Sequence, residues 1–205
     1  NPTGTYNSHD EVYSLLKKVP SSVLVVLDCA YFEYVTQEDY VKPIDLLNEF
    51  DNLLITKTFS KIHGLASIRV GYGIANPVLI EVLNRIRQPF NVNTLAQAMA
   101  AVAINDHEHI NQSIELNSQQ YDFLYDQLSK LGLECIPSVG NFITFKGNFI
   151  GKEMFNNLMK KGVIVRSVDL YDMKDFIRVT IGTKAENLKF LNALKELLWK
   201  LQLLA

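Results

Sequence analysis

The sequence has 205 residues, of which 48% are hydrophobic and 20% charged, and its formal net charge is −2. This is the composition of a globular protein with a sizeable core, and it lacks the basic excess expected for binding nucleic acid or a membrane surface. No apolar run reaches the roughly 18 residues that a membrane-spanning helix needs. Two cysteines, Cys29 and Cys135, are too few for a disulfide framework. We therefore expect a soluble, cytoplasmic protein without a signal peptide.

The first part of the chain predicts alternating helices and strands. Residues 1–4 (NPTG) form a turn by their local chemistry, because proline fixes φ and glycine permits a positive φ. A buried strand is expected over residues 22–27, without a solvent-facing side, and it ends on Asp28. A carboxylate just past the carboxyl end of a parallel strand points into the ligand crevice of an α/β sheet, although a turn or helix-capping role is equally open. The other elements predicted here are helices 8–18, 42–50, 77–87 and 94–104, and strands 53–55 and 70–75.

A long helix over residues 106–131 separates this part from an α+β part. Strands are predicted over 134–136, 141–145, 163–166 and 176–181, with helices over 151–161 and from Thr183 onward. Capping boxes at Ser8–Glu11 and Thr183–Glu186 predict where the first and last helices begin. The expected domains are residues 1–105, a connecting helix 106–131, and residues 132–205. His107 and His109 lie two positions apart on a helix and make a poor metal pair, so we expect no metal site.

Lys61 is the most informative single residue. It is the only cation between Thr58 and Ser67, and it follows a strand at the point where α/β sheets place their chemistry. Lysine forms Schiff bases with carbonyl compounds once its amine loses a proton, and Arg69 could hold an anion nearby. The alternative is an ordinary solvated surface lysine.

Four segments of the sequence together resemble one enzyme family. They are NPTG at residues 1–4, Asp-Cys-Ala-Tyr at 28–31, TFSK with GLASIRVGY at 58–72, and Arg178 followed by Val-Thr-Ile-Gly-Thr. Their order and spacing resemble those of the fold-type I enzymes that use pyridoxal 5′-phosphate (PLP), and within them the histidinol-phosphate aminotransferases. The resemblance implies an α/β fold: part of a mainly parallel sheet with helices on both faces, plus a smaller α+β C-terminal domain.

The resemblance also implies a cofactor site. Lys61 would be the catalytic residue that forms the Schiff base with PLP and then moves a proton on the substrate. Asp28 would pair with the ring nitrogen, while Asn1 and Tyr31 would bind the ring oxygen. The cofactor phosphate would be held by Thr58, Ser60 and Arg69.

For the substrate, the resemblance implies that Arg178 and Asn1 bind the anionic end and that Arg166 meets the phosphate. An exposed strand arginine is the alternative for both arginines. The implied reaction is transamination of histidinol phosphate with glutamate or 2-oxoglutarate in histidine biosynthesis, by a homodimer that binds neither nucleic acid nor membrane. Cys29 and Ser67 depart from the family pattern, at positions to which we assign no chemistry.

Three other readings stay open. Threonine-phosphate decarboxylase and aromatic aminotransferases resemble the same branch, and an aminotransferase-like effector domain of a transcription regulator is a non-enzymatic alternative. Because the chain starts at Asn1 without a methionine, we expect it to be the C-terminal portion of a longer protein. The resemblance places the ring-stacking aromatic residue and a second phosphate-binding loop in the preceding portion, so activity of residues 1–205 by themselves is not expected.

Overall fold

The structure is a computed structural model that describes residues 1–204. The chain divides by its contacts into two compact units: a first unit of residues 7–113, and a second unit of residues 1–6 together with residues 114 onward. Residues 1–6 group with the later part of the chain because Val139 N donates to Gly4 O at 2.9 Å and Thr144 Oγ1 donates to Pro2 O at 2.8 Å. The predicted limits at 105 and 131 differ from this division and remain a prediction.

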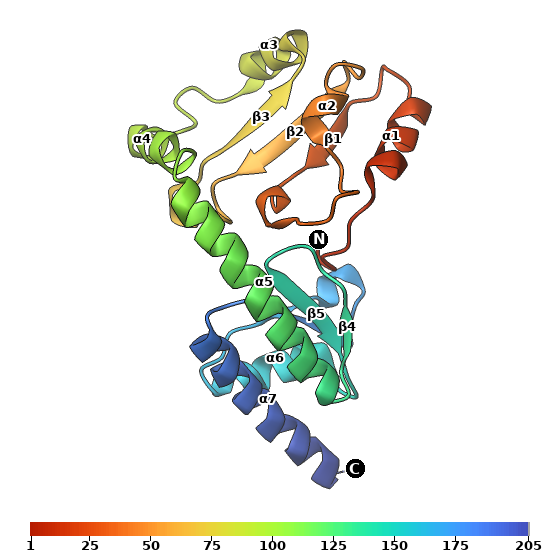
Figure 1. The fold of residues 1–205 in the computed structure, drawn as a ribbon, viewed down its shortest axis with the longest axis vertical. Coiled ribbons are helices and arrows are strands. Elements are labelled where there is room, and N and C mark those ends of the chain that lie inside the picture. Colours follow the sequence, from red (N-terminus) through yellow and green to blue (C-terminus); the bar gives the residue numbers. More distant parts are fainter. Residues whose placement is uncertain (205) are drawn as a thin grey trace. The chain divides into compact units, whose positions relative to one another are not determined.

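The first unit contains a three-stranded mixed sheet in the order β1-β2-β3 (Figure 1). Its strands are β1 (Val25–Asp28), β2 (Leu53–Thr58) and β3 (Gly71–Ala75). Strands β1 and β2 are parallel, with Asp28 opposite Thr56, whereas β2 and β3 are antiparallel. The expected mainly parallel arrangement therefore holds for one of these two strand pairs.

Helices of the first unit supply one apolar layer against this sheet. Leu16 and Leu46 pack with Leu53 and Ile55, and all four are nearly inaccessible to solvent. The strand expected over residues 22–27 was predicted to have no solvent-facing side. The structure differs from this prediction, because Val26 of β1 is 53% exposed. The helices are α1 (His9–Lys18), α2 (Pro43–Leu46), α3 (Pro77–Ile86), α4 (Thr94–Ala103) and the start of α5 (His107–Lys130).

The second unit is built on a four-stranded antiparallel sheet in the order β4-β5-β7-β6. Its strands are β4 (Glu134–Ile136), β5 (Phe142–Lys146), β6 (Arg166–Ser167) and β7 (Phe176–Thr180). The rest of α5, α6 (Gly151–Lys160) and α7 (Lys184–Leu204) complete the unit.

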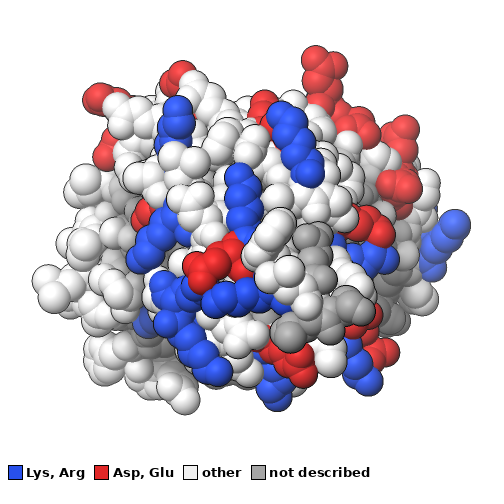
Figure 2. Space-filling view, turned by 90° about the horizontal axis from the view of Figure 1, so that it is seen from below, with Lys and Arg blue, Asp and Glu red and all other residues white. Residues whose placement is uncertain are grey.

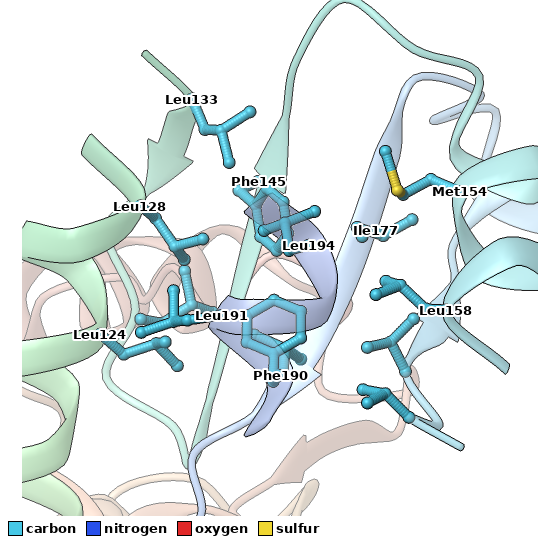
Figure 3. Packing of buried hydrophobic residues seen from close by; sticks show 14 of the residues in the cluster. Leu124, Leu128, Leu133, Phe145, Met154, Leu158, Ile177, Phe190, Leu191 and Leu194 are labelled. Carbon is cyan, nitrogen blue, oxygen red and sulfur yellow. The ribbon is translucent and has the colours of Figure 1, made fainter. Parts of the chain in front are cut away.

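One face of this second sheet carries the main hydrophobic core (Figure 3). Phe145 and Ile177 are fully buried, and they pack in one cluster with Leu128 of α5, Leu158 of α6 and Leu191 of α7. Because side chains alternate along a strand, the residues next to Phe145 and Ile177 point to the other face. That other face holds the polar residues described below.

Two predicted elements are shorter in the structure than expected. The strand expected over 163–166 pairs only at Arg166–Ser167, because Val163 N instead donates to Leu158 O at 3.0 Å and closes the end of α6. The helix expected over 42–50 is reduced to Pro43–Leu46, and tight turns follow it.

On the face seen in Figure 2, surface charge is mixed rather than concentrated. On the face in Figure 2, lysine and arginine side chains lie among aspartate and glutamate side chains, in line with the net charge of −2. Among residues 1–204, none of the helices combines the length and apolar character needed to cross a membrane.

Candidate active site

In the first unit, the parallel pairing of β1 and β2 brings two strand ends to one edge of the sheet. Cys29 N donates to Thr56 O at 2.9 Å directly after the last residue of β1, Asp28. The exposed Asp28 carboxylate accepts a hydrogen bond from Ala30 N at 3.1 Å. Carboxyl ends of parallel strands are where α/β folds bind ligands, so Asp28 stands at the expected edge.

Lys61 follows β2 by three residues, and its side chain meets Tyr31. The Lys61 Nζ atom lies 5.1 Å from the centroid of the Tyr31 ring. Two predicted site residues that are 30 positions apart in the sequence are therefore neighbours in the folded first unit. The contact leaves the amine beside a phenol whose hydroxyl can donate or accept a hydrogen bond.

The turn that directly follows Tyr31 is held against β2 by an ion pair. This turn is the 3₁₀ segment η1 (Phe32–Tyr34), and Lys57 Nζ lies 2.6 Å from Glu33 Oε1 and 4.1 Å from the Phe32 ring centroid. Only 15% of the Lys57 side chain and 19% of the Glu33 side chain are exposed. This pair cannot be found in the sequence, because two opposite charges 24 positions apart give no signal until the turn is folded onto the strand.

Cys29, the residue directly after Asp28, is buried. It is 1% exposed, and burial raises the pKa of its thiol to about 11, with Lys57 acting in the opposite direction. The thiol is therefore protonated at neutral pH and contributes packing rather than charge.

The loop after Lys61 is held in a defined conformation. Gly64 N donates to Lys61 O at 2.9 Å, and Gly64 takes a φ of +69°, which glycine adopts readily. The Nε2–H of His109 donates to Ile62 O at 2.9 Å, so the start of α5 anchors this loop. His109 thus has a structural contact that sequence analysis did not foresee. No group of three or more metal-ligating side chains occurs within residues 1–204.

Hydroxyl and guanidinium donors gather around the same loop. Ser60 N donates to Thr58 Oγ1 at 3.1 Å, and Arg69 Nη1 donates to Ala66 O at 2.6 Å. Arg69 itself takes a φ of 58° at the end of the 3₁₀ segment η2 (Ala66–Ile68), a left-handed conformation that is strained for a residue other than glycine. Strain of this kind concentrates at binding sites. The hydroxyls of Thr58 and Ser60 and the guanidinium of Arg69 suit a phosphate monoester. The Lys61 amine and the Asp28 carboxylate, both from the first unit, suit the aldehyde and the ring nitrogen of PLP.

The second unit contains a separate group of basic residues. Arg178 of β7 donates from Nη1 to Asn1 Oδ1 at 2.6 Å, and its Cζ atom lies 4.3 Å from the centroid of the Phe142 ring. Arg166 of β6 is directly opposite Arg178 in the antiparallel register. Side chains of directly opposed residues share one face of a sheet, and two like charges there are unfavourable unless an anion offsets them. The structure thus brings Asn1, Arg166 and Arg178 to one face of the second sheet.

The predicted site residues therefore form one group in each unit. Asp28, Tyr31 and Lys61 belong to the first unit with Thr58, Ser60 and Arg69, while Asn1, Arg166 and Arg178 belong to the second. Phe142 was not predicted as a site residue. The alternation along residues 141–145 could have placed it two positions from Thr144, on the arginine face of the sheet.

A mixed α/β unit with a lysine loop after its central strand, together with an antiparallel α+β unit carrying paired arginines, defines the fold-type I architecture. The chain belongs to the aminotransferase class I and II family, whose model matches residues 1–194.

Two curated relatives with the same name match nearly the whole chain. The chain is 47% identical over 198 residues to a histidinol-phosphate aminotransferase of Caldicellulosiruptor saccharolyticus, covering 97% of this chain and 55% of that protein. It is 48% identical to the protein of the same name from Moorella thermoacetica, covering 97% of this chain and 52% of that protein. The chain thus spans about half the length of these curated relatives.

A solved structure gives the same result for the fold. The histidinol-phosphate aminotransferase of Sinorhizobium meliloti, in complex with pyridoxal-5′-phosphate, superposes with a TM-score of 0.89 at 26% identity. The match covers 98% of this chain and 56% of that one. The predicted fold class is thereby confirmed.

Proposed function

We propose that the complete protein containing this chain is a PLP-dependent aminotransferase that exchanges the amino group of histidinol phosphate with 2-oxoglutarate. The observation that carries this proposal is the position of Lys61, in an anchored loop after β2 and 5.1 Å from the Tyr31 ring. Family membership and the named relatives support the reaction class. The cofactor is inferred from the family, from the PLP complex of the Sinorhizobium meliloti protein and from the donor set of the first unit.

PLP, when bound, supplies an electron sink that lets a substrate amine lose its α-proton. The chain's own residues would hold the group and handle the proton. Thr58, Ser60 and Arg69 would donate to its phosphate, and Asp28 would keep its ring nitrogen protonated. Lys61 would attach it covalently and, once released, would carry the proton away from the substrate Cα as a general base.

The arginine group of the second unit suits both partners of the exchange. Histidinol phosphate carries a phosphate, and glutamate carries two carboxylates. A guanidinium fork binds either anion through paired hydrogen bonds. We assign the anionic end of each substrate, a carboxylate of glutamate or the phosphate of histidinol phosphate, to Arg178 with Asn1. Arg166, directly opposite Arg178, would meet that phosphate as well. A homodimer and a cytoplasmic location belong to the same proposal.

The experiment is a product assay on the complete protein loaded with PLP. Histidinol phosphate and 2-oxoglutarate should give the keto product and glutamate in equal amounts, with no carbon dioxide. Release of carbon dioxide from threonine phosphate without glutamate formation would favour the decarboxylase reading, and turnover of aromatic amino acids alone would favour the aromatic aminotransferases. A folded, PLP-loaded protein that turns over none of these substrates would contradict the proposal.

A further inference from the structure

We propose that Phe142 and Thr144, neighbours on one face of β5, are positioning residues that set the geometry of the Arg178–Asn1 pair and so its affinity for an anion. This inference rests on the assignment of an anion to Arg178 under the proposed function. It adds two residues that do not touch the substrate but act through those that do.

First, the strand register places Thr144 next to the two arginines. Thr144 of β5 is directly opposite Arg178 of β7, and Arg178 is directly opposite Arg166 of β6. The three residues thus form a row across three strands on one face, with Phe142 beside the row two residues earlier in β5. The other face of β5 is fully occupied by the hydrophobic core.

The second step is the contact between Phe142 and the guanidinium group. The Phe142 ring is 2% exposed, and the Arg178 Cζ atom lies 4.3 Å from its centroid. At this distance the ring attracts the cation. The guanidinium donates hydrogen bonds through its N–H groups. One of these N–H groups donates to Asn1 Oδ1 at 2.6 Å.

The third step links Thr144 to Asn1. Thr144 is completely buried, and its hydroxyl donates at 2.8 Å to the carbonyl oxygen of Pro2, the residue directly after Asn1. A second hydrogen bond holds the same turn, from Val139 N to Gly4 O at 2.9 Å. A Cβ atom at Gly4 would overlap the Ser138 side chain, so the turn lies tightly against the strand connection. The Thr144 hydroxyl therefore fixes the backbone that carries the Asn1 carboxamide.

Together these contacts hold the guanidinium from two directions. Phe142 packs against the guanidinium, and Thr144, acting through Pro2, fixes the carboxamide that accepts from one of its N–H groups. A guanidinium held in this way loses less rotamer freedom when an anion binds than a free arginine does. Because a buried hydroxyl that satisfies a carbonyl also stabilises the fold, the variants are chosen to separate positioning from folding.

The test uses the complete, PLP-loaded protein, in which the cofactor occupies its own phosphate site, with inorganic phosphate as the probe. Thr144→Val keeps the shape and removes the hydroxyl, whereas Thr144→Ser keeps the hydroxyl. We expect Thr144→Val to weaken phosphate binding about threefold to tenfold, the effect of one hydrogen bond, and Thr144→Ser to stay within about twofold of the unmodified protein. Phe142→Leu should weaken binding by a similar factor through loss of the ring face.

A double-mutant cycle with Asn1→Ala decides the mechanism. If Thr144 acts through Asn1, Thr144→Val should add less than about twofold in the Asn1→Ala background. Equal losses in both backgrounds, no loss at all, or absence of phosphate binding by the unmodified protein would overturn the inference. Turnover of histidinol phosphate, measured separately, reports on the proposed function, so the two can fail independently.

Discussion

At the scale of single residues, the two groups of side chains do different kinds of chemistry. The first unit offers the Lys61 amine after β2 and, at the end of β1, the Asp28 carboxylate and the Tyr31 phenol, which suit a cofactor with an aldehyde and a ring nitrogen. The second unit offers guanidinium groups and a carboxamide, which suit an anion. Under the proposed function, the first group would bind the cofactor and the second group would bind the substrate.

The guanidinium of Arg178 should be irreplaceable by another cation. Lysine retains the charge but loses the planar fork and the stacking on Phe142. In the complete protein, Arg178→Lys should raise the KM for histidinol phosphate by about 10- to 100-fold, the range expected for losing a charge-assisted hydrogen bond. Steady-state kinetics provide the measurement, with Arg85→Lys as the control because Arg85 pairs with Glu81 on the exposed face of α3. An unchanged KM in Arg178→Lys would show that Arg178 does not bind the substrate anion.

Because of Cys29, the free energy of unfolding should fall as the pH rises above about 8.5. Burial raises the pKa of its thiol to about 11, whereas an unfolded thiol titrates near about 8.5. As the pH rises through this interval, the unfolded state loses the proton first, so the stabilisation present below about 8.5 is progressively lost. Urea unfolding midpoints at pH 8 and pH 10 should therefore differ more in the unmodified protein than in Cys29→Ala. The same difference in both proteins would show that the thiol does not carry this dependence.

At the scale of elements, local patterns predicted where the helices begin better than where the shorter strands lie. The Ser8–Glu11 and Thr183–Glu186 capping boxes are both formed, and the alternation in 176–180 matches β7. Strand β6 was misplaced because Val163 and Val165 are buried without pairing in the sheet, and burial gives an apolar sequence pattern whether or not a strand forms.

The N-terminal cap of α7 should stabilise the protein measurably. Thr183 Oγ1 accepts from Glu186 N at 3.4 Å, while the Glu186 carboxylate accepts from Thr183 N at 2.8 Å. Thr183→Ala should lower the free energy of unfolding by about 1 kcal/mol, the usual effect of losing such a cap. Thr183→Ser keeps the hydroxyl and should stay close to the unmodified protein in urea denaturation. Equal stability of all three proteins would indicate that the cap is energetically unimportant.

At the scale of the whole molecule, motifs predicted the architecture and pointed to candidate site residues, but they did not predict the contacts that hold those residues in place. Lys61, Asp28 and Arg178 stand beside recognisable sequence patterns, so they could be found before the structure. The Lys57–Glu33 ion pair and the hydroxyl of Thr144 at Pro2 join residues far apart in the chain. Such contacts depend on strand register and turn placement, which no local pattern encodes.

The family assignment makes one residue central to the whole account. Under the proposed function Lys61 would carry the cofactor and Lys57, four residues earlier, would not, because the Lys57 amine lies 2.6 Å from Glu33 Oε1. The most direct measurement is to add PLP to the complete protein, reduce it with borohydride, digest it and locate the pyridoxyl group by mass spectrometry. We predict a single label on Lys61 and none in Lys61→Ala. A folded protein that takes up no label, or takes it up at Lys57 instead, would contradict the assignment of this site.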